Sequence, residues 1–370
     1  MKVFHKILLG IVFLLLLTPI IQGEFNIFKI RGLRGAFTPT ENVTFKTDSI
    51  FSNGYQQKKE KYLSENFGFR NDAIRIRNQI LFSFFNKAKA NGVLVGKGNY
   101  LYEEDYIKSY FGVDFVSKDS IKTRIEKLKF VQEELEKKGK TIFFVIAPGK
   151  GSFYPEYFPE EYQQYKKSTT NYEVYQRLLS EYKINHIDFN RYFLQHKKDS
   201  PYLLYPKYGI HWSHYGSCLV SDSIIRYIEN KKHIDLANLT WQKVNLENAH
   251  DNDIDISRSL NLLFDTKLEK MGYPEIIFTK GSAKPNVLTI GDSFFWTLID
   301  AGILNSFNNF DYWFYNREKY IDRFIKPEEV GKLSLENEIK KNEVIIILCN
   351  EANLKDAGWG FVENSYKLFR

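Results

Sequence analysis

Two short motifs in the sequence could together perform acyl transfer. The first, Gly291-Asp292-Ser293, directly follows residues 286–290, an apolar run typical of a buried strand. A serine at a strand-to-helix turn can project its hydroxyl into a cleft while backbone N–H groups of the turn face a developing oxyanion. The same residues also fit an ordinary helix cap, because Asp and Ser are preferred there. The position after an apolar strand makes Ser293 the candidate nucleophile.

A hydroxyl nucleophile needs a base, and the second motif offers one. Residues 208–216 read Tyr-Gly-Ile-His-Trp-Ser-His-Tyr-Gly, so His211 lies in a loop that enters a predicted helix. His214 follows three residues later and could face the helix instead. The pair could also bind a metal ion, but no third ligand cluster accompanies it, so we predict no metal site. Either histidine could equally be a surface residue.

Further candidates follow the other apolar runs. Asn350 comes directly after residues 344–349, where its side-chain amide could join an oxyanion hole or cap the end of the strand. Glu351 is the next residue. Gly291 and Asp292 belong to the same supporting group, because the glycine permits a tight turn and the aspartate can tie the loop by hydrogen bonds.

Three residues could bind the substrate. Lys150 and Tyr154 follow the apolar run 141–147 and could line an acceptor groove, although surface roles are common for both residue types. Trp212 could stack on a sugar ring, and the alternative is a structural role beside the loop.

The pattern of elements predicts an α/β fold. Apolar runs alternate with helical periodicity, which indicates a doubly wound parallel sheet with helices on both faces. In such sheets, ligands bind beyond the carboxyl ends of the strands, where the motifs above lie. The predicted strands are 141–147, 185–189, 286–290 and 344–349, and the predicted helices are 63–85, 117–138, 172–182, 215–229 and 327–340.

The N-terminus predicts export. Lys2 and Lys6 precede the apolar residues 7–21, a run of about 15 residues that suits a secretory segment and is slightly short for a comfortable span. No small-x-small cleavage site follows, which favours an uncleaved anchor in the inner (cytoplasmic) membrane. The alternatives are a cleaved signal and a buried helix. The predicted domains are a signal anchor or signal peptide at 1–23, a stalk or irregular lead-in at 24–60, and a catalytic domain at 61–370.

Composition excludes several classes of protein. The 370 residues are 43% hydrophobic and 26% charged, which argues against global disorder and against a polytopic membrane protein. The net charge of +7 is spread along the chain and does not indicate a nucleic-acid partner. The two cysteines, Cys218 and Cys349, are predicted to be separate buried thiols.

Together these motifs resemble a known family, the SGNH-hydrolase-like polysaccharide O-acetyltransferases of the alginate acetylation type (AlgJ and AlgX) and the related DHHW proteins. The resemblance covers most of the chain after the anchor, and the order and spacing of its motifs carry it. The matching segments are Asn66 to Asn71, Val93 to Gly96, Asn99 to Tyr102, Ala147 to Lys150 with Tyr154-Pro155 and Phe158-Pro159, His211-Trp212-Ser213 with Gly216, and Gly291 to Ser293.

The resemblance implies roles for both motifs. Ser293 would be the acetyl-accepting nucleophile and His211 its general base. The family usually has an aspartate two residues before the histidine, where this chain has Gly209. A carboxylate from elsewhere could replace it, with Glu351 and Asp292 as candidates. Otherwise a backbone carbonyl could hold the ring, or the protein could be inactive. Replacing Gly209 with Asp would separate a weakened catalyst from the other two accounts.

The implied function is extracytoplasmic O-acetylation of an exported or cell-surface polysaccharide, through a serine acyl-enzyme and with no cofactor. The implied location is the periplasm or another extracytoplasmic compartment. Since acetyl-CoA is absent there, the resemblance implies a membrane-bound O-acyltransferase partner as the acetyl donor. Two alternatives remain at this point. One is a carbohydrate acetylesterase of the same fold, and the other is a catalytically silent polysaccharide-binding or assembly protein.

Overall fold

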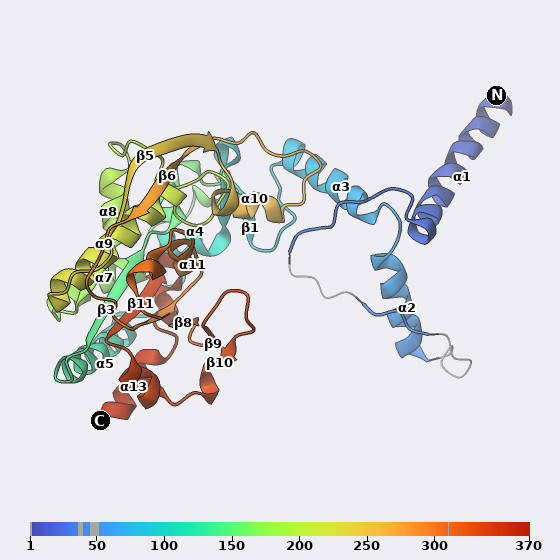
Figure 1. The fold of residues 1–370 in the computed structure, drawn as a ribbon. Helices are drawn as coiled ribbons and strands as arrows, with labels where there is room; N and C mark the ends of the chain where they lie inside the picture. The colour runs from blue at the N-terminus through green and yellow to red at the C-terminus, as the bar shows by residue number, and fades with distance from the viewer. Residues whose placement is uncertain (1, 36–39, 45–51, 310) are drawn as a thin grey trace. The chain divides into compact units, whose positions relative to one another are not determined.

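The computed structural model describes residues 2–35, 40–44, 52–309 and 311–370. Figure 1 shows the ribbon. The chain divides into two compact units, which we describe separately. One contains residues 1–90 and 257–266, and the other contains residues 91–256 and 267–370. The domain boundaries expected at residues 23 and 60 stay predictions.

The first unit consists of three helices and the segment 257–266. Helix α1 (Lys2–Phe25) includes Val3–Phe25, which is long and apolar enough to cross a membrane, a test that a signal sequence also passes. Helices α2 (Asn53–Glu65) and α3 (Arg70–Phe85) replace the single helix predicted for 63–85. That prediction is wrong because Phe69, just before α3, adopts a left-handed backbone with φ of 62°. Helix α2 also begins inside the segment expected to be irregular, of which residues 36–39 and 45–51 lie outside the described residues.

A seven-stranded sheet forms the centre of the second unit. Its order is β10-β9-β8-β7-β11-β3-β4. The five strands from β8 to β4 run parallel, and β9 and β10 continue the sheet antiparallel. The bounds are β3 (Thr141–Ala147), β4 (His186–Asp188), β7 (Val287–Gly291), β8 (Asp311–Phe314), β9 (Glu318–Tyr320), β10 (Glu328–Glu329) and β11 (Val344–Asn350). The predicted mostly parallel α/β fold is confirmed.

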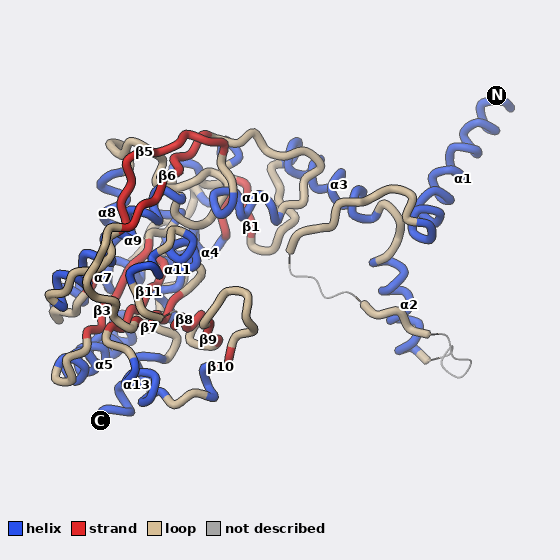
Figure 2. Tube along the Cα trace, viewed as in Figure 1, coloured by secondary structure: helices blue, strands red, loops and turns tan. Residues whose placement is uncertain are grey.

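Helices cover both faces of this sheet, as Figure 2 shows. Alternate side chains of β3, β7 and β11 pack with α5 (Lys118–Glu136), α7 (Asn171–Glu181), α12 (Leu335–Lys341) and α13 (Phe361–Phe369) in one large apolar core. The opposite face carries α8 (Phe189–His196), α9 (His214–Lys232) and α11 (Phe294–Asp300), with Phe143 of β3 against Tyr227 of α9. Cys218 and Cys349 are separate buried thiols, as predicted.

Several elements lie outside the predicted pattern. An antiparallel hairpin, β5 (Leu239–Asn248) with β6 (Lys270–Phe278), contacts α9. The stretch predicted as a helix from 327 contains β10 and begins its helix only at Leu335, because Ser334 caps α12 there. The remaining elements are β1 (Val93–Val95), β2 (Leu101–Glu103), α4 (Glu104–Phe111), α6 (Lys150–Phe153) and α10 (Asp255–Ser259).

Candidate active site

Ser293 lies between β7 and α11, at the carboxyl end of a central strand. Its turn is held by the buried Asp292 carboxylate, which accepts hydrogen bonds from the backbone N–H of Phe294 (3.1 Å) and Asn350 (2.7 Å). The side-chain amide of Asn353 donates to the same carboxylate at 3.0 Å. The Tyr312 hydroxyl donates to the Asp292 carbonyl at 2.6 Å. Asp292 therefore fixes the turn on which the serine sits.

The loop before α9 positions His211. Its neighbour Trp212 is fully buried, and the indole N–H donates to the Thr297 hydroxyl in α11. Two residues on, Ser213 caps α9 by accepting from the backbone N–H of Gly216 at 2.9 Å. The His211 ring packs edge to face against Phe294, with 4.8 Å between ring centroids. These contacts bring the imidazole next to the Ser293 turn.

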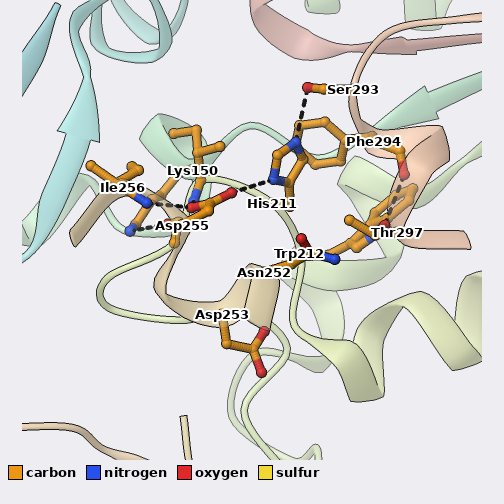
Figure 3. Close-up of polar contacts among 12 residues, drawn as sticks. Lys150, His211, Trp212, Asn252, Asp253, Asp255, Ile256, Ser293, Phe294 and Thr297 are labelled. Carbon is orange, nitrogen blue, oxygen red and sulfur yellow. Dashed lines mark hydrogen bonds and ion pairs between the residues drawn. The ribbon is translucent and has the colours of Figure 1, made fainter. Parts of the chain in front are cut away.

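A third residue completes a relay that Figure 3 shows. His211 Nε2 lies 2.9 Å from Ser293 Oγ, and His211 Nδ1 lies 2.6 Å from Asp255 Oδ2. The other oxygen of Asp255 accepts from the backbone N–H of Ile210 at 3.0 Å. Asp255, the first residue of α10, therefore contacts both the histidine ring and the loop that carries it. This arrangement can orient the ring and stabilise its positive form.

The surroundings of His211 raise its pKa. Burial alone would lower its pKa, because it disfavours the charged ring. The charge and hydrogen bond of Asp255 more than offset burial, and Asp292 adds to the effect, so the pKa of His211 lies above its ordinary value of 6.5. A histidine in this setting can take a proton from a hydroxyl and then return it.

The structure corrects the expected source of the orienting carboxylate. Asp292 is occupied by the hydrogen bonds of the serine turn, and Glu351 accepts from the Ser152 hydroxyl at 2.7 Å. Burial raises the pKa of Glu351 to about 7. Neither carboxylate is the partner of His211 Nδ1, which is Asp255.

Gly209 cannot carry the family's usual aspartate in this structure. A Cβ at this position would lie 2.6 Å from the Asn252 carbonyl oxygen and 2.9 Å from Cγ of Pro206. The loop therefore packs too closely for a side chain here, and the carboxylate comes from Asp255 instead.

The three residues expected to bind substrate are buried. Trp212 is 0% exposed and packs against Phe294 with 5.0 Å between centroids. Tyr154 is 7% exposed, and its hydroxyl donates to the Tyr205 carbonyl at 3.1 Å. Lys150 is 0% exposed. This burial contradicts the expected contacts with a sugar, and Trp212 has the structural role that was the alternative.

Lys150 instead holds the loop that precedes His211 by hydrogen bonds. Its ammonium donates to the carbonyls of Lys207 (2.8 Å) and Gly209 (2.6 Å), the residues just before the histidine. Burial lowers the pKa of Lys150 to about 7, although the nearby Asp255 carboxylate acts in the opposite direction. Asn350 acts as a cap, since its side-chain oxygen accepts from the Asn353 backbone N–H at 3.2 Å.

Sequence reasoning missed two residues of this site. Asp255 lies 44 residues after His211, and its only signal was a cluster of acidic residues at 251–255. Tyr315 was also missed, and its backbone N–H donates to the Gly291 carbonyl at 2.9 Å, next to the Ser293 turn. Burial raises the pKa of Tyr315 to about 12, so its hydroxyl keeps its proton at neutral pH.

His214 stands apart from the relay, with its backbone N–H donating to Asp253 at 3.2 Å. Across the described ranges, no group of three or more His, Cys, Asp or Glu side chains is arranged to hold a metal ion.

Residues 93–262 match the family described as SGNH hydrolase-like domain, acetyltransferase AlgX. The match includes His211 and Asp255 and ends before Ser293. No curated protein matches the sequence.

Three solved structures are similar to the chain. The O-acetyltransferase domain of Pseudomonas putida AlgJ is 13% identical with a TM-score of 0.49, over 75% of this chain and 99% of that domain. Pseudomonas aeruginosa AlgX is 14% identical with a TM-score of 0.44, over 74% of this chain and 67% of its own. Bacillus cereus PatB1 is 14% identical with a TM-score of 0.42, over 66% of this chain and 93% of its own.

Proposed function

From the membership of residues 93–262 in the AlgX family of SGNH hydrolase-like acetyltransferase domains, we propose that this protein is a polysaccharide O-acetyltransferase. The observation that carries the proposal is the Ser293–His211–Asp255 relay, with contacts of 2.9 and 2.6 Å. These distances lie within the reach required of a nucleophile, its base and the residue that orients the base.

The proposed reaction has two halves. In the first, His211 Nε2 accepts the Ser293 proton as Oγ bonds to the acetyl carbonyl carbon of the donor. The resulting oxyanion is stabilised by the backbone N–H of Ser293, because the N–H groups of Phe294 and Phe295 already donate to Asp292. When the tetrahedral intermediate collapses, the donor's leaving group departs with the proton from His211, and Ser293 is left as an acetyl ester.

In the second half, a sugar hydroxyl attacks this ester. His211 accepts the hydroxyl proton, the sugar oxygen bonds to the acetyl carbon, and the proton returns to Ser293 Oγ as it leaves. Asp255 stabilises the charged imidazole. Water in place of the sugar would give acetate, which is the esterase reaction.

We further propose that the site works outside the cytoplasmic membrane. The apolar helix Val3–Phe25 supports this, because an N-terminal segment of that length and composition can direct export and hold a chain at the membrane. Acetyl groups would then come from a membrane-bound O-acyltransferase, and the acceptor would be an exported or cell-surface polysaccharide.

The test compares the full chain with its Ser293→Ala variant, using an activated acetyl ester and a panel of oligosaccharides, and follows the acetyl group by mass. We expect acetylated sugar only with the unmodified chain. Acetate alone would point to an esterase. No turnover dependent on Ser293 would contradict the proposed function and favour a polysaccharide-binding protein.

A further inference from the structure

A cavity of about 620 Å³ adjoins the serine site at the carboxyl ends of β8 and β11. Its size lies within the range of ligand-binding pockets. Tyr315 and Asn353 line it. The Tyr315 backbone N–H donates to the Gly291 carbonyl at 2.9 Å, and the Asn353 amide donates to the Asp292 carboxylate at 3.0 Å, so the lining contacts the turn that carries Ser293. The rest of its lining is Arg124, Asn316, Arg317, Asp356, Trp359, Gly360 and Glu363.

Two aromatic side chains in the lining are held by unfavourable backbone conformations. Tyr315 and Trp359 have φ of 50° and 44°, in the left-handed region that bulky residues rarely adopt. Trp359 lies between Gly358 and Gly360, which are also left-handed. The two rings meet edge to face at 5.1 Å. Local strain of this kind is found mainly where function requires it.

Two residues of the lining also carry buried acceptors that lack donors among the described residues. Asn316 donates its amide N–H to the Trp359 carbonyl at 2.9 Å, but its side-chain oxygen is buried with no partner in the described part of the chain. The same holds, within those residues, for one carboxylate oxygen of Glu363, whose other oxygen pairs with Arg124 at 3.2 Å. Buried acceptors without donors are costly, so a small rotation of either side chain toward a hydroxyl donor in the cavity would be favourable.

The charges of the lining cancel. Arg124 and Arg317 contribute two positive charges, and Asp356 and Glu363 contribute two negative ones. An anionic polymer such as a polyuronate would bring repeated carboxylates next to Asp356 and Glu363. A neutral sugar instead offers hydroxyl donors to the free acceptors and an apolar ring face to Trp359.

We propose that this cavity binds a neutral sugar of the acceptor polysaccharide and presents a hydroxyl of that chain to the Ser293 acetyl ester. The proposal rests on the proposed function for its role in transfer, while the binding itself is independent of catalysis. Trp359 is the stacking surface, and Asn316 and Glu363 accept the sugar hydroxyls.

The experiment measures binding by the full-length Ser293→Ala chain in detergent, without any acetyl donor. The probes are cellopentaose and mannopentaose as neutral sugars and a mannuronate pentamer as the acidic one. Binding is followed by the indole N–H signals of the five tryptophans. The signal missing in Trp359→Phe identifies Trp359.

We expect a neutral pentasaccharide to shift the Trp359 signal saturably and the mannuronate pentamer to bind at least ten-fold more weakly. Trp359→Gly should weaken neutral-sugar binding at least ten-fold, and binding is measured well below its unfolding temperature, because the Trp359 ring also packs against the apolar core. Glu363→Gln should weaken it several-fold. Trp241→Phe, in β5, serves as the matched control and should leave binding unchanged.

The proposal is overturned if neither neutral sugar shifts Trp359, if Trp359→Gly binds as tightly as the parent, or if the mannuronate pentamer binds as well as the neutral sugars. The proposed function is tested by a separate measurement. It fails if the unmodified chain acquires no acetyl group on Ser293.

Discussion

At the scale of single residues, the site depends on an aspartate far from its histidine in sequence. Ser293 and His211 could be selected from the sequence because each follows a recognisable local pattern, a strand end and a loop before a helix. Asp255 could not, since its role depends on how α10 lies against the 208–211 loop. An aspartate two residues before His211 would not fit, because the Asn252 carbonyl fills the space next to Gly209.

Asp255→Asn should lower kcat by about 10³- to 10⁴-fold, because an amide neither fixes the same tautomer nor stabilises the charged imidazole. The neutral ring is the base, so activity should rise with pH through the pKa of His211, which lies above 6.5 in the parent chain. Without the Asp255 charge this pKa falls, and the rising limb should move to lower pH. Steady-state rates across pH measure both effects. Asp251→Asn, at an exposed side chain, is the control, and an unchanged profile in Asp255→Asn would refute the assigned role.

Gly209→Asp should not improve the enzyme. The new side chain would meet atoms at 2.6 and 2.9 Å, so we expect a loss of about 1–3 kcal/mol in unfolding free energy and lower activity. Gly331→Asp is the matched control, because nothing lies within 4 Å of a Cβ there. Denaturant unfolding and turnover measure the outcome. Higher activity in Gly209→Asp would mean that Asp255 orients the ring poorly.

At the scale of elements, the central strands could be predicted from their apolar runs, because strands buried on both faces are apolar throughout. The strands at the edge of the sheet could not be predicted in this way. Strand β9 spans three residues and β10 two, which is too short for periodicity to show. The β5–β6 hairpin was missed because Gly272 and Pro274 interrupt β6. Such strands are selected by long-range pairing rather than by local preference.

Lys319 should be essential for this edge of the sheet. The residue is 8% exposed, and its ammonium lies 2.7 Å from Glu338 in α12 and 3.3 Å from Asp311 in β8. Burial lowers the pKa of Lys319, but the two carboxylates more than offset that effect. Lys319→Met would leave both carboxylates buried beside an apolar chain, so we expect a loss of about 3 kcal/mol in unfolding free energy.

Lys332→Met is the control for this change, because the Lys332 side chain is 74% exposed and its ion pair should contribute less than about 1 kcal/mol. Equal effects of the two substitutions in chemical denaturation would contradict the importance of the buried pair.

At the scale of the whole molecule, the proposed function requires a catalytic unit outside the cytoplasm and an N-terminal helix that takes it there. Composition and the apolar N-terminus could be interpreted from sequence alone, because export segments have a local signature. The division into two units could not be predicted from the sequence, because residues 257–266 belong with the first 90 residues although they are distant in sequence. Asn78 of α3 shows the reason, donating to the Leu260 carbonyl at 2.8 Å.

The N-terminal helix should remain on the mature protein as a membrane anchor. We expect the chain to stay with membranes after alkaline carbonate extraction and its intact mass to include residues 1–23. Removal of residues 2–25 should leave the protein in the soluble fraction. A soluble extracytoplasmic form that begins near residue 23 would show instead that the segment is a cleaved signal.

The most direct measurement of the central claim is the mass of the protein shortly after mixing with an activated acetyl ester in the absence of sugar. We predict that the unmodified chain gains one acetyl group, that peptide analysis places it on Ser293, and that adding an acceptor sugar removes it. His211→Ala and Asp255→Asn should acquire it far more slowly. No acetyl on Ser293, or equal acetylation of Ser293→Ala, would contradict the account.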